Sequence, residues 1–363
     1  MKGKRPDDLP DWPIFREIFD HYLPSEFPAL LDQSRRWLAE RPLAGMKVLD
    51  CTPVFRNTLT QYAALMCAGA EVSVHVGKMM PCDPDLLPRL EGLGVRLIGR
   101  ERCEETFDCV GDCAGDHADV PSRLGYVELT RTGGQAYLHA KQPVFWTDSS
   151  HIKEIETGLG TGDGFRRGLV HLGLGDFSGR KMVLFGCGKV GTGIALHAVS
   201  HGADLSVVDN PLHHDHAPFG ARFISWKDRP AIEAALREAW CVVTATGIRH
   251  ALAGQFDPDI LLKGSMHVVN LGVEDEYGPA IPEERVLNRK KPLNFILEEP
   301  TLLRYIDPTM ALQNEGVLYL RNHRDLPAGL FKPPEELEAA ILRTVRDEGL
   351  ITQELSMLEK EYK

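Results

Sequence analysis

A run of apolar residues passes directly into a cluster of glycines at residues 183–193, VLFGCGKVGTG. The residues that lead into the glycines, KMVLFG, have the composition of a buried strand. Residues 190–201 repeat apolar side chains at helical spacing, and Gly202 follows as a helix C-cap. A strand that turns this tightly into a helix is typical of doubly wound sheets, so the segment predicts a parallel α/β domain.

The spacing of Gly186, Gly188 and Gly191 fits the pattern GxGxxG, which indicates a dinucleotide-binding turn. The first glycine permits the turn, the second lets the backbone approach a pyrophosphate, and the third lets helix and strand pack closely. N–H groups at the start of the helix would then face the phosphates. Asp209 ends the next strand, where a carboxylate can accept hydrogen bonds from ribose hydroxyls and would repel a 2′-phosphate. We therefore predict NAD as the cofactor; a glycine turn that holds no coenzyme is the alternative.

Strand and helix patterns alternate twice along the chain, which predicts an α/β fold of two doubly wound Rossmann-like lobes with parallel sheets. Four glycines at 157–164 predict a flexible linker with hinge motion. We expect a substrate and catalytic domain at 1–160, completed by 306–363, and an NAD-binding domain at 165–305. The expected strands are 46–51, 71–76, 95–99, 106–112, 126–130 and 143–148 in the first half, and 181–186, 203–209, 241–247, 266–272 and 293–299 in the second.

The composition restricts the class of ligand. The formal net charge is −11 and the chain has no long block of lysine and arginine, which argues against nucleic-acid or membrane-surface binding. No stretch approaches the roughly 20 apolar residues that span a bilayer, so we expect a cytoplasmic protein. The cysteines lack zinc-site spacing and the histidines of 213–216 share one short loop, so we expect no metal. The expected partner is a small-molecule substrate.

Small polar residues end two later strands. VTATG at 243–247 and VVNLG at 268–272 each finish with a glycine, and ligands of open α/β sheets bind beyond the carboxyl ends of the strands. Thr244, Thr246 and Asn270 are therefore predicted to contact the nicotinamide half of the cofactor, with capping of the next helix as the alternative for each. The predicted cofactor contacts also include Lys189, Val190 and Ala245.

These segments, in this order and at similar spacing, resemble the cofactor domain of the S-adenosylhomocysteine hydrolases, or adenosylhomocysteinases. The likeness extends beyond that domain and covers roughly residues 45–343. DCVGDCAGD resembles the family's DDGGD stretch, VELTRTGG its EETTTG and FWTDSSHIKEI its NDSVTKSKF. The resemblance implies a homo-oligomer that keeps NAD bound, oxidises a sugar 3′-hydroxyl transiently and thereby permits elimination and addition at the 5′-position.

The resemblance also implies catalytic residues in the first domain. Lys153 lies within one residue of the family's lysine, and a solvated surface lysine is the alternative. Asp112 flanks the family's aspartate position, which is Cys113 here, and Glu128 matches the first glutamate of EETTTG. His151 is a candidate for the proton role of a missing histidine, and a plain surface histidine is the alternative.

Two threonines also match the family, whereas three positions lack the family's histidines. Thr130 and Thr132 resemble the family's threonines beside the nicotinamide carboxamide. Pro53 or a neighbour, Val273 and Asp307 occupy positions where the family has histidines, so the resemblance is to a divergent member without those catalytic histidines.

We predict an NAD-dependent oxidoreductase, or a hydrolase or lyase of the adenosylhomocysteinase type, that transfers hydride on a small polar substrate in an interdomain cleft. The substrate is expected to be nucleoside-like or amino-acid-like. The alternatives are a catalytically silent NAD-binding regulator and a genuine adenosylhomocysteinase with rearranged catalytic residues. Whether NAD is regenerated in each turnover or released as NADH stays open.

Overall fold

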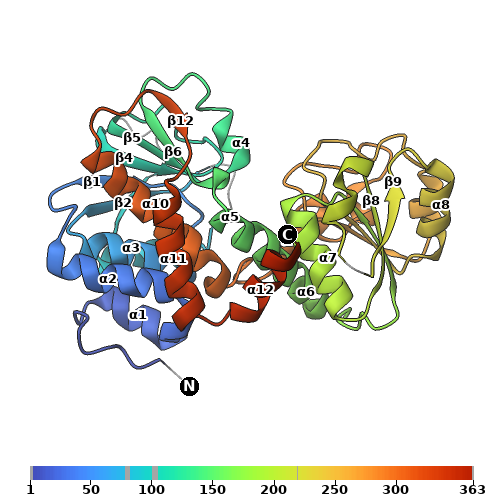
Figure 1. Cartoon of the computed structure of the whole chain (residues 1–363), viewed down its shortest axis with the longest axis horizontal. Coiled ribbons are helices and arrows are strands. Elements are labelled where there is room, and N and C mark those ends of the chain that lie inside the picture. Colours follow the sequence, from blue (N-terminus) through green and yellow to red (C-terminus); the bar gives the residue numbers. More distant parts are fainter. Residues whose placement is uncertain (1–2, 78–81, 100–104, 219, 362–363) are drawn as a thin grey trace. The chain divides into compact units, whose positions relative to one another are not determined.

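The structure is a computed structural model that describes residues 3–361 except 78–81, 100–104 and 219. The chain divides into two compact units, which are coloured along the sequence in Figure 1. Unit 1 is Met1–Lys153 with Leu303–Leu355, and unit 2 is Glu154–Leu302 with Ser356–Lys363. The domain limits expected from the sequence stay a prediction. Within the described ranges, no helix combines the length and the apolar character that a membrane span requires.

Unit 1 is built on a seven-stranded sheet in which every strand pair is parallel. The strand order is β12-β6-β5-β4-β1-β2-β3, so the chain starts in the middle and winds outward in both directions. The strands are β1 Lys47–Asp50, β2 Glu71–His75, β3 Arg96–Ile98, β4 Phe107–Asp112, β5 Ser122–Glu128, β6 Pro143–Trp146 and β12 Gly329–Phe331.

The helices of unit 1 include a packed group in which α10 contacts α2, α3 and α11 (Figure 1). α10 also contacts β4, β5 and β6, so the segment that follows unit 2 in the sequence completes the core of unit 1. The helices are α1 Pro13–His21, α2 Pro28–Glu40, α3 Leu59–Cys67, α4 Arg131–Gly134, α10 Leu303–Asn322 and α11 Glu335–Glu348. Two further helices, α5 Ile152–Glu154 and α12 Thr352–Glu361, cross the sequence boundaries between the units.

Unit 2 is a five-stranded parallel sheet of order β11-β10-β7-β8-β9. Alternate residues of the same strands belong to two apolar clusters: Leu184 and Val243 to one, Val183 and Val242 to the other. Both faces of this sheet are therefore covered, as a doubly wound fold requires. The elements are α6 Thr161–His171, β7 Lys181–Phe185, α7 Lys189–Ser200, β8 Asp204–Asp209, β9 Arg222–Ser225, α8 Arg229–Glu238, β10 Cys241–Thr244, α9 Asp259–Lys263 and β11 His267–Asn270.

The predicted fold class, two doubly wound Rossmann-like lobes with parallel sheets, is confirmed. Two local predictions are wrong. Residues 293–299 do not form a strand; Leu293–Ile296 is a short 3-10 helix that follows Pro292 and packs its first residue into the apolar core.

The glycine-rich segment 157–164 is helical and not a flexible linker. Ile155–Gly160 is a π-helix that continues into α6. A Cβ atom on Gly193 would lie 1.9 Å from the carbonyl oxygen of Gly158, and one on Gly162 would lie 2.4 Å from that of Gly193. These glycines allow close helix packing in unit 2, a long-range reason that local composition does not reveal.

Candidate functional site

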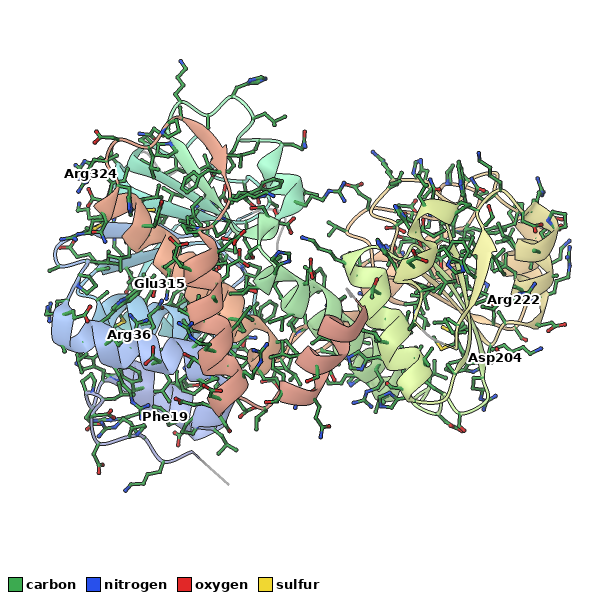
Figure 2. The ribbon with its side chains drawn as sticks, in the orientation of Figure 1. Phe19, Arg36, Asp204, Arg222, Glu315 and Arg324 are labelled. Atoms are coloured by element: carbon green, nitrogen blue, oxygen red, sulfur yellow. The ribbon has the colours of Figure 1, made fainter. Side chains whose placement is uncertain are left out.

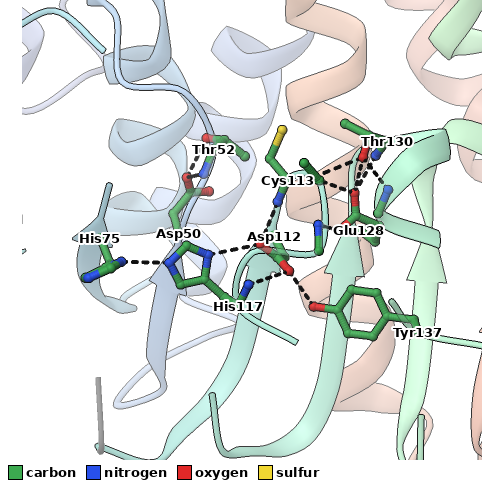
Figure 3. Close-up of polar contacts among 12 residues, drawn as sticks. Asp50, Thr52, His75, Asp112, Cys113, His117, Glu128, Thr130 and Tyr137 are labelled. Carbon is green, nitrogen blue, oxygen red and sulfur yellow. Dashed lines mark hydrogen bonds and ion pairs between the residues drawn. The ribbon is translucent and has the colours of Figure 1, made fainter. Parts of the chain in front are cut away.

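Three carboxylates end neighbouring strands of the unit 1 sheet. Asp50 ends β1, Asp112 ends β4 and Glu128 ends β5, and all three side chains are buried (Figure 3). Asp112 pairs in register with Glu128, and Asp50 pairs with Gly111. Because the carboxyl ends of parallel strands meet at one edge, the sheet places these groups together. The structure thus brings together the predicted residues Asp112 and Glu128.

Asp112 is surrounded by four hydrogen-bond donors (Figure 3). Its Oδ1 accepts from the Cys113 backbone N at 2.8 Å and contacts the His117 Nδ1 at 3.1 Å. Its Oδ2 accepts from the Tyr137 hydroxyl at 2.7 Å and from the His117 backbone N at 3.1 Å. This is a buried carboxylate with satisfied oxygens, as a charge in the interior requires.

His117 connects Asp112 to a second histidine. The His117 Nε2 lies 2.6 Å from the Nδ1 of His75, and the two rings meet edge to face. When His117 is neutral and donates its Nδ1–H to Asp112, its Nε2 carries a lone pair and accepts from His75 Nδ1–H. The contacts therefore define one tautomer for each ring. His117 is buried and His75 is half-buried.

Glu128 organises the turn that follows β4. Its Oε1 accepts from Ala114 N at 3.2 Å, Thr130 N at 2.7 Å and the Thr130 hydroxyl at 2.6 Å, while its Oε2 accepts from Gly115 N at 3.2 Å. A Cβ atom on Gly133 would lie within 2.5 Å of the Glu128 carboxyl group, so a glycine is needed there. Burial, assisted by the charge of Asp112, raises the pKa of Glu128 to about 7.

Asp50 lies beside this cluster at the end of β1. Its Oδ1 accepts from the Thr52 backbone N at 3.0 Å and the Thr52 hydroxyl at 2.5 Å, and its Oδ2 accepts from Gln61 Nε2 at 3.2 Å. Burial raises the pKa of Asp50 to about 6, and the nearby charge of Asp112 acts in the same direction. Two carboxyl groups on this edge therefore have pKa values close to neutrality.

The remaining predicted residues of unit 1 have different surroundings. Lys153 is buried in α5, where its backbone N donates to the Ser150 hydroxyl at 3.2 Å. His151 is exposed, and its backbone N donates to Glu338. Thr130 caps α4 by accepting from Gly133 N, and the exposed Thr132 donates to Thr130 at 3.4 Å. The predicted roles of these residues stay predictions.

Asp307 and Val273 stand where the resembled family has histidines, and the structure explains only the first of the two. Asp307 is fully buried, and its two oxygens accept from Ala29 N at 3.0 Å and Leu30 N at 2.9 Å in the first turn of α2. Burial raises the pKa of Asp307 to about 7. This side chain is therefore a helix cap. Val273, by contrast, is exposed, and nothing in the structure explains its identity.

The glycine turn of unit 2 has the expected close contacts. Gly186 has a φ of +93°, which favours glycine, and a Cβ atom on Gly191 would lie 2.0 Å from the carbonyl oxygen of Gly186. Gly188, at the N-cap of α7, is exposed, and a Cβ atom there would meet no protein atom within 4 Å. Lys189 and Val190 form the partly exposed first turn of α7.

Asp209 links the end of β8 to this turn. Its Oδ2 accepts from Cys187 N and its Oδ1 from Asn210 N, both at 2.5 Å, and His213 Nδ1 lies 3.1 Å from Oδ1. The turn, the open space beside Gly188 and the N–H groups that begin α7 fit the diphosphate of a dinucleotide. The Asp209 carboxylate keeps lone pairs for sugar hydroxyls. These residues would hold NAD through its diphosphate and adjacent ribose.

A carboxylate that the sequence analysis missed organises the end of β10. Glu276 is fully buried and accepts from the Thr244 hydroxyl, from Thr246 N and its hydroxyl at 2.8 Å each, and from Gly247 N at 2.7 Å. Ala245, between these residues, donates its backbone N–H to Phe185. Thr244 and Thr246, which are predicted to contact the cofactor, therefore hold this loop through hydrogen bonds to Glu276.

Asn270 at the end of β11 is likewise engaged. Its amide donates to the carbonyl oxygens of Gly272, Glu274 and Lys290, and its oxygen accepts from Gly272 N at 3.1 Å. Asn270 therefore holds the loop that follows β11, and its predicted contact with the cofactor stays a prediction. The side chains that the analysis missed are Asp50, His75, His117, Tyr137 and Glu276. Asp50 had a visible signal at the end of the expected strand 46–51, and His117 had one as the histidine of the segment DCAGDH.

Comparison with known proteins identifies a family model in unit 2 and relatives along most of the chain. Residues 174–254 match the model of a family described as putative NAD(P)-binding. The chain is similar to S-inosyl-L-homocysteine hydrolase of Methanopyrus kandleri, at 24% identity over 392 residues that cover 92% of this chain and 91% of that protein. It is similar to an adenosylhomocysteinase of Gloeobacter violaceus at 24% identity over 371 residues, with coverage of 87% and 85%.

A solved structure shares the fold. The structure of a dipicolinate synthase chain from Bacillus halodurans matches with a TM-score of 0.51 at 14% identity, over 77% of this chain and 99% of that one. The NAD(P)-binding match coincides with the glycine turn, and the sequence similarity extends over both units. The chain is a divergent relative of the adenosylhomocysteinases and carries an NAD-binding domain.

Proposed function

We propose that this protein is an NAD-dependent enzyme that transfers hydride at a carbinol or amine carbon of a small polar, nucleoside-like or amino-acid-like substrate. Similarity to adenosylhomocysteinases and the NAD(P)-binding match support an NAD-dependent enzyme. The observation that carries the proposal is the buried cluster of Asp112, Glu128, His117 and Tyr137 at the carboxyl edge of the unit 1 sheet. Buried titratable groups of this kind are typical of catalytic sites.

NAD, when bound, accepts a hydride from such a carbon. We assign the accompanying proton to Glu128, because a carboxyl group whose pKa is about 7 can take and return a proton near neutral pH. Its Oε2 accepts from Gly115 N, whereas Oε1 already accepts from three donors, so Oε2 is the proposed site of the proton. Asp112 positions His117 and Tyr137 through its two oxygens.

Lys153 is the second proposed acid or base. It is buried, and a lysine amine can exchange a proton with an alcohol or an imine. His151 is exposed, so we assign it a weaker claim than His117, which is buried and fixed by Asp112. A substrate position between the two domains and a homo-oligomeric state stay predictions.

The experiment begins with protein purified without added coenzyme. Mass spectrometry and near-ultraviolet absorbance report whether NAD or NADH is retained. The protein is then incubated with NAD and one compound at a time. The compounds are S-adenosyl-L-homocysteine, S-inosyl-L-homocysteine, adenosine and inosine. Release of a free thiol indicates a hydrolase cycle that regenerates NAD, and accumulation of NADH indicates a dehydrogenase.

Glu128→Gln tests the assigned proton role. We expect its turnover to fall by about a hundredfold or more, the usual contribution of a general acid or base. The matched control is Glu336→Gln, an exposed glutamate of α11, which should keep wild-type turnover. Full activity of Glu128→Gln would remove this carboxyl group from the chemistry.

Two alternatives have specific support. The helix-capping role of Asp307 and the absence of histidine at Pro53 and Val273 favour a silent NAD-binding regulator. The similarity over 92% of the chain favours a genuine adenosylhomocysteinase with rearranged catalytic residues. Bound NAD without change of any compound in the panel would favour the regulator. Thiol release from S-adenosyl-L-homocysteine would establish the hydrolase.

A further inference from the structure

A cavity of about 310 Å³ lies between α2, α10 and α11 of unit 1. It is formed by segments far apart in the sequence, and none of its lining residues belongs to the cluster around Asp112. Its volume is at the lower end of the range of small-molecule pockets. The apolar side chains of the lining include Ala311, Leu337 and Ile341, and the charged ones are Asp32, Arg36 and Glu315.

The charged side chains leave the cavity with more acceptors than donors. Arg36 Nε donates to Asp32 Oδ2 at 2.8 Å, and Arg36 Nη2 donates to Glu315 Oε1 at 3.3 Å (Figure 2 shows Arg36 and Glu315). In the part of the chain that the structure describes, no donor reaches Asp32 Oδ1 or Glu315 Oε2. Two carboxylates and one guanidinium give this lining one excess negative charge.

Glu315 lines the cavity and is held by hydrogen bonds from α2. Gln33 Nε2 donates to Glu315 Oε1 at 3.0 Å and to the Ala311 carbonyl oxygen at 3.1 Å, and Gln33 Oε1 accepts from Asn314 Nδ2 at 2.9 Å. Gln33 and Asn314 are almost completely buried, and Glu315 is 9% exposed. A ligand that binds Glu315 therefore meets a carboxylate whose orientation is already set, which reduces the entropy lost on binding.

We propose that this cavity binds a small primary amine. Its ammonium group would supply three donors to Glu315 Oε2 and Asp32 Oδ1 and would neutralise the excess negative charge. Its alkyl chain would pack against Leu337 and Ile341 of α11. A carboxylate ligand meets two like charges here, and a neutral alcohol leaves the excess charge uncompensated, so neither matches the lining.

The test is isothermal titration calorimetry of the whole protein with n-butylamine, 1-butanol and butyrate at equal ionic strength. We expect n-butylamine to bind about tenfold or more tightly than 1-butanol, and butyrate to give no heat, since charge-assisted hydrogen bonds exceed neutral ones by at least that factor. Equal binding of amine and alcohol would contradict a cation site. No heat from any of the three would remove the site altogether.

Two variants locate the binding. Glu315→Gln keeps the size of the side chain and an acceptor for Gln33 but removes the charge, so the advantage of amine over alcohol should disappear. Ala340→Trp fills the cavity from an exposed position of α11 that lines it, whereas Ala339→Trp changes the neighbouring exposed residue, which does not. Amine binding should be lost only in Ala340→Trp; loss in both variants, or in neither, overturns the assignment to this cavity.

Discussion

The two sheets have the same doubly wound topology but expose different chemistry at their carboxyl edges. In unit 1 the strands end in buried carboxylates, Asp50, Asp112 and Glu128. In unit 2 the corresponding turn consists of Gly186 and Gly188, and backbone N–H groups begin the next helix. A parallel sheet therefore supplies a place for a site, while the residues that follow each strand decide whether that place binds an anion or exchanges a proton.

Burial has opposite consequences at the two edges. In unit 1 it raises the pKa values of Asp50 and Glu128 toward neutrality, so the edge stores protons. In unit 2 the buried carboxylate Glu276 accepts hydrogen bonds from the loop 244–247, so its oxygens serve to hold that loop. The same side-chain type is thus a candidate reactive group in one unit and a scaffold in the other.

The largest expected effect is the pH dependence of stability from Asp50. Its pKa is about 6 in the folded protein against an ordinary value of 3.8, so the folded state holds the proton more tightly than the unfolded chain. The stabilisation is complete below about pH 4 and is lost as the pH rises through about 6. Asp50→Asn should remove this dependence, which amounts to about 3 kcal/mol. Denaturant unfolding from pH 4 to pH 8 measures it.

The fold should tolerate this variant. An asparagine keeps an acceptor for Thr52, and the Gln61 amide can turn so that its oxygen, which has no partner within the described residues, accepts from the new amide. Asp215→Asn, at an exposed position of unit 2, controls for the loss of one carboxylate. A difference between wild type and Asp50→Asn that stays constant across the pH range would show that Asp50 holds no extra proton in the folded state.

Two glycines of unit 2 separate stability from cofactor binding. In Gly191→Ala the new Cβ would lie 2.0 Å from the Gly186 carbonyl oxygen, so the free energy of unfolding should fall by about 1–3 kcal/mol. In Gly188→Ala the Cβ meets no protein atom and φ is −81°, so stability should be unchanged. NAD affinity should nevertheless fall about tenfold to a hundredfold in Gly188→Ala, because the methyl group occupies the approach of the diphosphate.

Thermal unfolding and calorimetric titration with NAD distinguish the two effects. Gly188→Ala that binds NAD as the wild type does would place the diphosphate elsewhere. Gly191→Ala with wild-type stability would mean that the turn relaxes without cost. Either result would contradict the contrast between the two edges, in which backbone groups form the site of unit 2 and side chains form the site of unit 1.

Much of this distinction could be predicted from the sequence. The glycine turn, the fold class and the positions of Asp112 and Glu128 follow from strand ends, which are local patterns. The His75–His117 contact spans 42 positions, and the contact of Thr246 with Glu276 spans 30, so neither contact is visible in a local stretch of sequence. Side-chain contacts of this range depend on strand order, which the pattern does not determine.

The wrong prediction for the glycine-rich segment has the same origin, and so does the unforeseen role of Asp307. Glycines at 157–164 indicate flexibility in isolation, but Gly158 and Gly162 pack against Gly193 of a helix that begins more than twenty residues later. Asp307 occupies a position where the resembled family has a histidine, and only the packed structure reveals that it caps α2. The local sequence indicates which roles a residue can have, and the tertiary contacts determine which of these roles it has.

Glu276→Gln tests whether the scaffold carboxylate of unit 2 supports cofactor binding. An amide replaces one acceptor oxygen by a donor, so either Gly247 N or the Thr246 pair loses its partner. We expect NAD affinity to fall by about tenfold through a shifted loop. Glu274→Gln, an exposed glutamate two positions earlier, is the control. Unchanged affinity in Glu276→Gln would separate the loop from the cofactor.

The smallest expected effect compares the same contact in both units. His117 Nδ1 lies 3.1 Å from Asp112 Oδ1, and His213 Nδ1 lies 3.1 Å from Asp209 Oδ1, but the first histidine side chain is 5% exposed and the second 46%. Because water competes only at the exposed pair, two-bond proton–nitrogen spectra of histidine-labelled protein should show His117 fixed as the Nδ1–H tautomer and His213 averaged between tautomers. The variants His117→Gln and His213→Gln assign the signals. Averaging at both histidines would mean that the edge of unit 1 is open to water, and its buried carboxylates would then have no special claim to proton transfer.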